Sequence, residues 1–137
     1  MLAVELAKYL DALGLVKYDE AGSTGDVYIG QLPSVPDNLV AIYPTGGPGS
    51  DQKLGYDSPS VQVIVRNVNI VSADSKAREI YDALHGISSI SLPDGTWTVS
   101  CRGIQSGPVY IGQDKNDRYE FSLNFMLEVR NKNANRE

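Results

Sequence analysis

The chain has 137 residues, a length typical of one domain, and 42% of them are hydrophobic, as is ordinary for a globular protein. Its net charge of −5 argues against gripping nucleic acid through the phosphates, because that mode of binding needs clustered lysines and arginines. The single cysteine excludes an internal disulfide and a thiolate metal cluster, and no apolar run is long enough to cross a membrane.

The first predicted element is a helix over residues 2–14, because leucines recur there at helical spacing and Gly14 is a suitable end. Two short strands are predicted next, over Val27–Ile29 and Leu39–Tyr43. The segment between them contains two prolines, which must end the first strand. We therefore expect the two strands to form a hairpin.

A glycine-rich segment over residues 45–58 resembles a phosphate-binding loop only superficially. Lys53 follows glutamine rather than glycine, leucine replaces the required serine or threonine, and Pro59 and a β-branched run follow where a helix is needed. Loops of this length in a compact domain are usually functional or mobile. We predict that the segment is a protein contact with three anchors, Tyr43, Leu54 and Tyr56.

The segment "SVQVIVRNVNIV" over residues 60–71 is predicted to be a strand with a change of parity. Valines alternate with polar residues as far as Arg66, but Val68 and Ile70 continue with the opposite parity. One face of a strand cannot hold both sets. The sequence predicts either a bulge near Arg66 and Asn67 or a sheet that is buried on both faces there.

A second helix is predicted over residues 73–85, with Ser72 as its N-cap and Gly86 at its end. Arg78 and Asp82 are four residues apart and are expected to pair on the exposed side. One apolar stripe should face the core: Ala73, Ala77, Ile80 and Leu84.

The remaining chain is predicted to form strands joined by tight turns. Asp94-Gly95 is a hairpin dipeptide, and the strand after it should turn Trp97, Val99 and Cys101 toward the core. After a strand in "GPVYIGQ" and a turn at "DKND", residues 118–130 alternate with one exception, Met126. The residues expected to face inward are Tyr119, Phe121, Leu123, Phe125, Leu127 and Val129.

The order of helix, strands, helix and strands predicts an α+β fold, because no βαβ unit repeats along the chain. We expect a mainly antiparallel sheet with both helices packed on one face. Residues 1–130 should form a single domain, and the polar segment 131–137 should be a frayed tail.

No combination of residues predicts catalysis, a metal site or a cofactor, so the chain is not expected to be an enzyme. The only histidine, His85, has no nucleophile or carboxylate predicted beside it, and Cys101 should face the core. A calcium loop counted from Asp114 would need glycine and glutamate where Tyr119 and Phe125 stand. Asp114 and Asp117 lie at a turn tip, which offers no pocket for acid–base chemistry.

The run "GPVYIGQDKNDRYEFSLNFMLEV" resembles the closing segment of the small minor capsid proteins of tailed bacteriophages, which belong with the tail-terminator or tail-completion proteins. The matching pattern is Tyr110-Ile111-Gly112-x-Asp114 followed by Phe121-Ser122-x-Asn124, and the order of elements agrees as well. The resemblance implies a subunit of a six-fold ring that caps the head-proximal end of the tail tube. It also implies three partners, namely copies of itself, the tail tube protein and the head or neck connector, in a virion assembled in the host cytoplasm.

The residues predicted to form interfaces are Tyr43, Lys53, Leu54, Tyr56, Asp114 and Arg118. DNA would pass through an acidic ring without specific binding, and no membrane contact is expected. The nearest alternative is a neck or head-completion protein, such as a stopper or connector. The more distant alternatives are a small enzyme and a host binding module.

Overall fold

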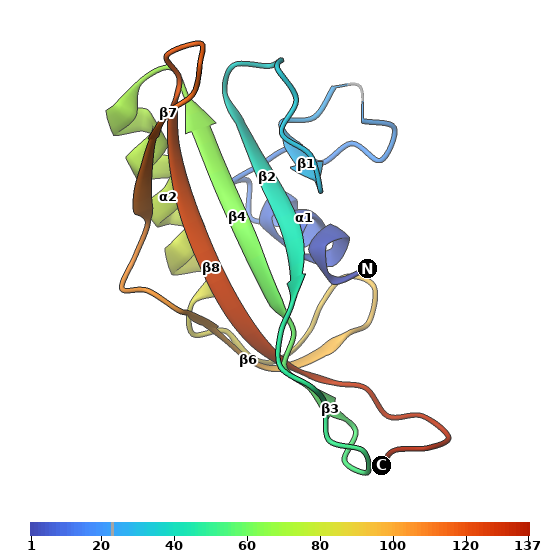
Figure 1. Ribbon diagram of the computed structural model, residues 1–137. Helices are drawn as coiled ribbons and strands as arrows, with labels where there is room; N and C mark the ends of the chain where they lie inside the picture. Colours follow the sequence, from blue (N-terminus) through green and yellow to red (C-terminus); the bar gives the residue numbers. More distant parts are fainter. Residues whose placement is uncertain (23) are drawn as a thin grey trace.

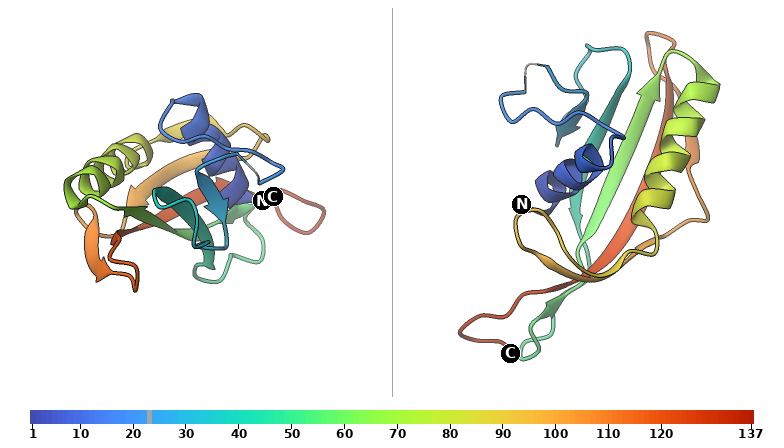
Figure 2. Two further views of the ribbon diagram at one scale, coloured as in Figure 1. Left: turned by 90° about the horizontal axis from the view of Figure 1, so that it is seen from above. Right: turned by 180° about the vertical axis from the view of Figure 1, so that it is seen from behind.

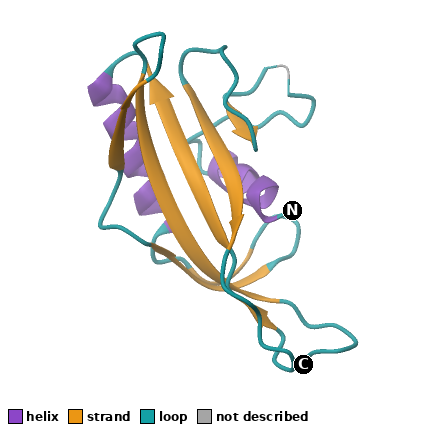
Figure 3. Cartoon of the chain, in the orientation of Figure 1, coloured by secondary structure: helices purple, strands orange, loops and turns teal. Residues whose placement is uncertain are grey.

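The computed structural model describes residues 1–22 and 24–137, and it has the predicted α+β fold (Figure 1). Both helices lie on the same face of one sheet, whose strands are mainly antiparallel (Figure 3). The elements are α1 (Leu2–Ala12), β1 (Val27–Ile29), β2 (Leu39–Gly46), β3 (Tyr56–Asp57), β4 (Ser60–Asn67), α2 (Ile70–Leu84), β5 (Ser88–Ser91), β6 (Trp97–Gly103), β7 (Val109–Gln113) and β8 (Tyr119–Arg130).

The long strand β8 is the centre of the sheet, because four other strands pair with it, all of them antiparallel. On one side it pairs first with β4 and then, at its C-terminal end, with β3. On the other side it pairs first with β7 and then with β6. In the half of the sheet where β8 begins, the strand order is therefore β1-β2-β4-β8-β7.

The core lies between the sheet and the two helices, as the views from above and behind show (Figure 2). The alternation in β8 is confirmed: five of its six inward side chains are buried, and Tyr119 packs against the core while partly exposed. Each fully buried side chain of this size stabilises the fold by about 1.5–3 kcal/mol. The helices contribute Ala3, Leu6, Ala7 and Leu10 from α1 and the predicted stripe Ala73, Ala77, Ile80 and Leu84 from α2.

The predicted hairpin between β1 and β2 is wrong, because the two strands pair in parallel. Residues 30–38 carry the chain back along β1, so that both strands run in the same direction. Two buried arginines hold this connection, and they come from β4 and from the turn before β8. Contacts from elsewhere in the chain, rather than a local turn, therefore set the pairing of β1 with β2.

The change of parity after Arg66 arises because the strand ends and a helix begins, and not from a bulge. Strand β4 ends at Asn67, and α2 begins at Ile70 with Asn69 as its N-cap in place of the predicted Ser72. The side chain of Asn69 accepts a hydrogen bond from Ser72 N at 2.9 Å, as an N-cap residue should. Val68 and Ile70 are exposed at this junction.

The alternative prediction, a sheet buried on both faces at this point, is also wrong, because Val68 and Ile70 are exposed and lie outside β4. The second face does carry one small apolar cluster further along the strand. Ile64 packs there against Leu39 and Ala41 in a small cluster of its own. On α2, the predicted pair of Arg78 with Asp82 is replaced by a pair with Asp74, whose Oδ2 lies 3.3 Å from Arg78 Nε.

Trp97 does not face the core as predicted, and 45% of its surface is exposed. The pairing of β6 with β8 shifts between Thr98 and Ser100, so an irregularity at Val99 changes the parity of the strand. Thr98 and Cys101 consequently both point inward and are buried.

Candidate interaction surfaces

The six predicted interface residues lie in separate regions and do not form one surface. Lys53, Leu54 and Tyr56 project beyond one end of the sheet, whereas Asp114 and Arg118 lie in the β7–β8 turn at the other end (Figure 1). Tyr43 lies between them on β2 and packs against the small cluster on the second face. Burial and the charge of Glu120 raise the pKa of the Tyr43 hydroxyl.

Residues 47–58 and 131–137 form a projecting arm, in which the C-terminal segment packs against the glycine-rich segment (Figure 1). Arg136 donates from Nη2 to Leu54 O at 2.9 Å and to Tyr56 O at 2.7 Å. The amide of Glu137 donates to Lys53 O at 2.8 Å, and Asn131 N donates to Gly55 O at 2.7 Å. Residues 131–137, which the sequence predicts to be frayed, are thus hydrogen-bonded along the arm.

Asp57 is the polar centre of this arm. Its carboxylate accepts hydrogen bonds from Ser50 Oγ at 2.5 Å and Asn131 Nδ2 at 2.7 Å, and Arg136 Nη2 lies 2.9 Å away. These hydrogen bonds, together with the charge of Arg136, lower the pKa of Asp57 to about 2. The carboxylate is therefore ionised at neutral pH, and it links Ser50 of the glycine-rich segment to Asn131 and Arg136 of the C-terminal segment.

Two glycines permit the close packing of the arm. Gly47 has a φ of +106°, and a Cβ there would lie 2.2 Å from Ser58 O. A Cβ on Gly55 would lie 2.8 Å from the carbonyl carbon of Glu137. The glycines that suggested a phosphate loop in fact allow two backbone segments to touch. At its surface the arm exposes 58% of Leu54, and Arg130 lies 4.6 Å from the ring centre of Tyr56.

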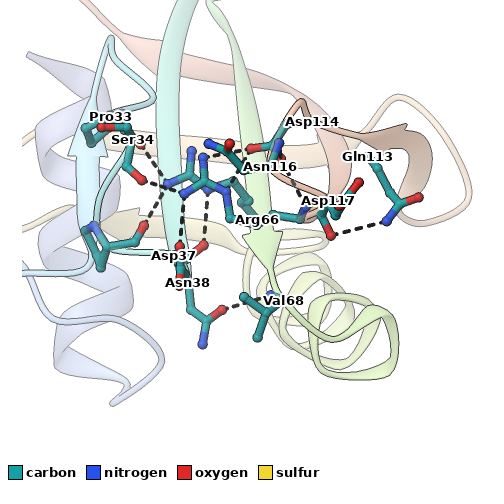
Figure 4. Close-up of polar contacts among 12 residues, drawn as sticks. Pro33, Ser34, Asp37, Asn38, Arg66, Val68, Gln113, Asp114, Asn116 and Asp117 are labelled. Atoms are coloured by element: carbon teal, nitrogen blue, oxygen red, sulfur yellow. Dashed lines mark hydrogen bonds and ion pairs between the residues drawn. The ribbon is translucent and has the colours of Figure 1, made fainter.

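Arg118 and Arg66 form a buried network at the other end of the sheet (Figure 4). Arg118 donates to Asp114 Oδ2 from Nε at 2.9 Å and lies 3.2 Å from Asp37 Oδ1, and it also donates to Ser34 O. Arg66 donates to Pro33 O at 2.7 Å, Pro36 O at 2.6 Å and Asp37 O at 3.1 Å. Sequence reasoning predicted Asp114 and Arg118 as interface residues, but here they fix the 33–38 segment.

An open hollow of about 440 Å³ lies over this network, and its lining includes Glu120. Burial and the nearby Asp114 raise the pKa of the Glu120 carboxyl, although Arg66 and Arg118 act in the opposite direction. Within the part of the chain that the structure describes, the buried Oε2 of Glu120 has no hydrogen-bond partner. The hollow is open to solvent, and its lining also includes Leu32, Ser34 and Lys115.

The β7 edge patch, which we define as Ile104, Val109, Tyr110 and Ile111, is an exposed apolar surface that sequence reasoning did not identify. These side chains lie on β7 and on the segment that leads into it. One signal was present in the sequence, because residues 103–113 contain no charged side chain.

The remaining candidates for chemistry have structural roles. His85 Nδ1 accepts a hydrogen bond from Gly103 N at 2.9 Å, and its ring stacks on Tyr81. Burial raises the pKa of the Cys101 thiol to about 12, so the thiolate is not formed near neutral pH. No group of histidine, cysteine and carboxylate side chains suited to a metal ion occurs among residues 1–22 and 24–137. The helices in these ranges are too short or too polar to span a bilayer.

The chain thus forms a single open sheet with both helices on one face, and the arm and the 33–38 segment lie at opposite ends of the sheet (Figure 1). A family model described as bacteriophage tail terminator protein matches residues 9–131. The chain therefore belongs to the bacteriophage tail terminator family and is a structural component of a virion tail. This family comprises structural virion proteins and is not a family of enzymes.

A solved structure has the same fold. The chain is similar to a protein from the virion of a native gene transfer agent particle, with a TM-score of 0.65 and 19% sequence identity, and the match covers 94% of each chain. A search of curated proteins found no match.

Proposed function

We propose that six copies of this chain form a ring that caps the head-proximal end of the tail tube, stops its polymerisation and joins it to the neck. The observation that carries this proposal is the match of the terminator family over residues 9–131. In this proposal the partners are the tail tube protein on one side and a head or neck connector on the other, and assembly takes place in the host cytoplasm.

The shape of the subunit supports a position between two partners. The arm follows β2, and the 33–38 segment precedes it, so the two surfaces lie at opposite ends of the sheet (Figure 1). Both are held by arginine side chains that donate to backbone carbonyls. Surfaces that are ordered before binding lose less conformational entropy when a partner docks.

Charge supports passage of DNA through such a ring. Each chain carries −5, so six copies would carry about −30 and would repel the phosphates of the genome. A bore lined by lysine and arginine would contradict this part of the proposal.

Electron microscopy of particles assembled without this chain tests the proposed function. We expect overlong or unjoined tails, because tube growth would no longer be stopped. Full heads that lose their DNA would instead indicate a neck or head-completion protein. Joined tails of normal length would contradict both functions. Size-exclusion chromatography with light scattering should show a hexamer for the chain alone or bound to its tube protein, and monomer in both samples would contradict the ring.

A further inference from the structure

Strand β7 is an open edge of the sheet. It pairs with β8 on one side, and no strand in the described part of the chain pairs with its other side. It has apolar side chains on both faces of the sheet. Tyr110 packs beside Phe121 on the helix side, and Val109, which pairs with Ser122, lies on the other face. Ile111 is 51% exposed at the irregularity in the pairing.

Such an edge is unusual in a protein that stays monomeric. Free edges are commonly protected by charged side chains, by prolines or by irregular backbone. Both β5 and β7 have irregular backbone, because Ser89 has no partner in the pairing with β6 and Ile111 has none in the pairing with β8. Strand β7 differs in exposing three large apolar side chains, Val109, Tyr110 and Ile111. Residues 103–113 carry no charge, and the apolar patch accompanies unpaired backbone groups. A strand from another chain would satisfy the backbone and cover the patch at the same time.

The opposite margin of the same sheet is also an open edge. Strand β1 is the last strand on that side, and residues 27–36 contain no charged side chain. In the half of the sheet where β8 begins, β1 and β7 are the two outermost strands (Figure 1). Each subunit thus has two different uncharged edges, one at each margin of the sheet.

We propose that the β7 edge of one copy pairs with the β1 edge of the next copy, so that the sheet continues from subunit to subunit around the ring. This inference rests on the proposed ring. A closed ring requires unlike patches in a head-to-tail arrangement, and one chain supplies both patches. Asp19 and Glu20 line a hollow beside β1, but residues 103–113 on the β7 side carry no charge that would repel them.

Ile111→Lys and Val109→Lys test the β7 edge, with Val71→Lys as the matched control. Val71 is 69% exposed and apolar but lies on α2, outside the sheet. Native mass spectrometry would measure the ring at equal concentrations, with tube protein present. We expect the two β7 variants to lower the fraction of ring at least about ten-fold, equivalent to about 1.4 kcal/mol. Val71→Lys should assemble like the wild type.

Wild-type assembly by both β7 variants would overturn the pairing, and so would loss of the ring in Val71→Lys alone. Circular dichroism would show that each variant is folded, and Ile111→Gln is a milder second variant if a lysine prevents folding. If the β7 variants form less ring while the wild type assembles and limits tail length, the inference stands. If they assemble normally, the inference fails but the proposed function survives. Failure of the wild type itself to limit tail length would refute the proposed function.

Cross-linking tests the partner edge. A variant with both Gln31→Cys and Ile111→Cys, treated with a flexible bismaleimide, should give a ladder of covalent oligomers that ends at the closed ring. Cys101 is buried, so the wild type should give no such products. Equal cross-linking by Ile111→Cys alone would mean that β7 pairs with itself, which would overturn the assignment of β1.

Discussion

Glu5 on α1 and Thr96 in the turn between β5 and β6 form a partly buried contact that joins the N-terminal helix to this turn. The Glu5 carboxylate accepts hydrogen bonds from the Thr96 hydroxyl, from Thr96 N at 3.2 Å and from Asp94 N at 3.0 Å. Only 2% of Glu5 is exposed. The turn therefore combines its own backbone hydrogen bonds, such as that from Leu92 N to Thr96 O, with acceptors from a residue about 90 positions earlier in the chain.

Replacing Glu5 should destabilise the domain strongly. Glu5→Ala leaves three partly buried donors of Asp94 and Thr96 without their acceptor, and a fully buried donor in this state costs about 1–3 kcal/mol. We expect a loss of at least about 2 kcal/mol in the free energy of unfolding, measured by urea denaturation. Glu20→Ala is the control, because the pair of Glu20 with Lys8 is exposed and should contribute less than about 1 kcal/mol. Equal effects of the two variants would refute the role of Glu5.

Arg66→Lys should loosen the 33–38 segment even though the positive charge is kept. An ammonium group cannot reproduce the three hydrogen bonds that the planar guanidinium donates to Pro33, Pro36 and Asp37. We expect a loss of about 1–3 kcal/mol and faster hydrogen exchange of the Val68 amide, which donates to Asn38 Oδ1. Arg78→Lys, at an exposed ion pair, should change neither quantity measurably.

Arg136→Ala should release the arm and expose it to proteases. Removing the guanidinium takes away the hydrogen bonds to Leu54 O and Tyr56 O and the ion pair with Asp57. Trypsin should then cleave after Lys53 faster than in the wild type, and the appearance of the fragment 1–53 would measure the rate. Lys132→Ala removes an exposed charge from the same segment and should leave this rate unchanged. An unchanged rate in Arg136→Ala would show that the arm is held by other contacts.

The arm should also loosen on acidification. Because the pKa of Asp57 falls from 3.8 to about 2 on folding, the ionised carboxylate stabilises the fold fully above pH 4–5, and this contribution is lost as the pH falls toward 2. Amide chemical shifts of Asn131 and Glu137 should change over this range. Asp57→Asn should lack that transition, and a transition of equal size in the variant would assign it to another group.

Glu120→Gln should stabilise the domain at neutral pH. Folding raises the pKa of this carboxyl, chiefly through burial, so stability falls as the pH rises through the interval above the ordinary glutamate value. The amide removes this loss and can donate a hydrogen bond. We expect a higher melting temperature than the wild type at pH 7, and a smaller difference at pH 4. A lower melting temperature at pH 7 would show that attraction to Arg66 and Arg118 outweighs burial.

The local elements followed from the sequence because their patterns were long and regular. The alternation of β8 and the stripe on α2 were predicted correctly, since each pattern repeats enough times to fix the buried face. The end of β4 was not, because Val68 and Ile70 look like strand residues and only the cap by Asn69 shows that a helix begins there. The hairpin prediction failed for a related reason, since the prolines indicated a turn but not its partner contacts.

The candidate surfaces depended more heavily on contacts between distant residues. The sequence indicated that the glycine-rich segment was exceptional, but not that Arg136 would hold it as an arm. It also indicated Asp114 and Arg118, whose roles proved to be inside the network that fixes the 33–38 segment. The β7 edge patch was overlooked, because an apolar strand looks the same in sequence whether its edge is paired or free.

By itself the sequence determined the class of fold, the buried faces of its regular elements and its resemblance to phage tail proteins, because these depend on periodicity and order along the chain. Only the tertiary structure decided which edges of the sheet stay open, how β1 pairs with β2 and which charges are buried. Those properties depend on residues such as Glu5 and Thr96 or Arg118 and Ser34, which meet only after the chain has folded.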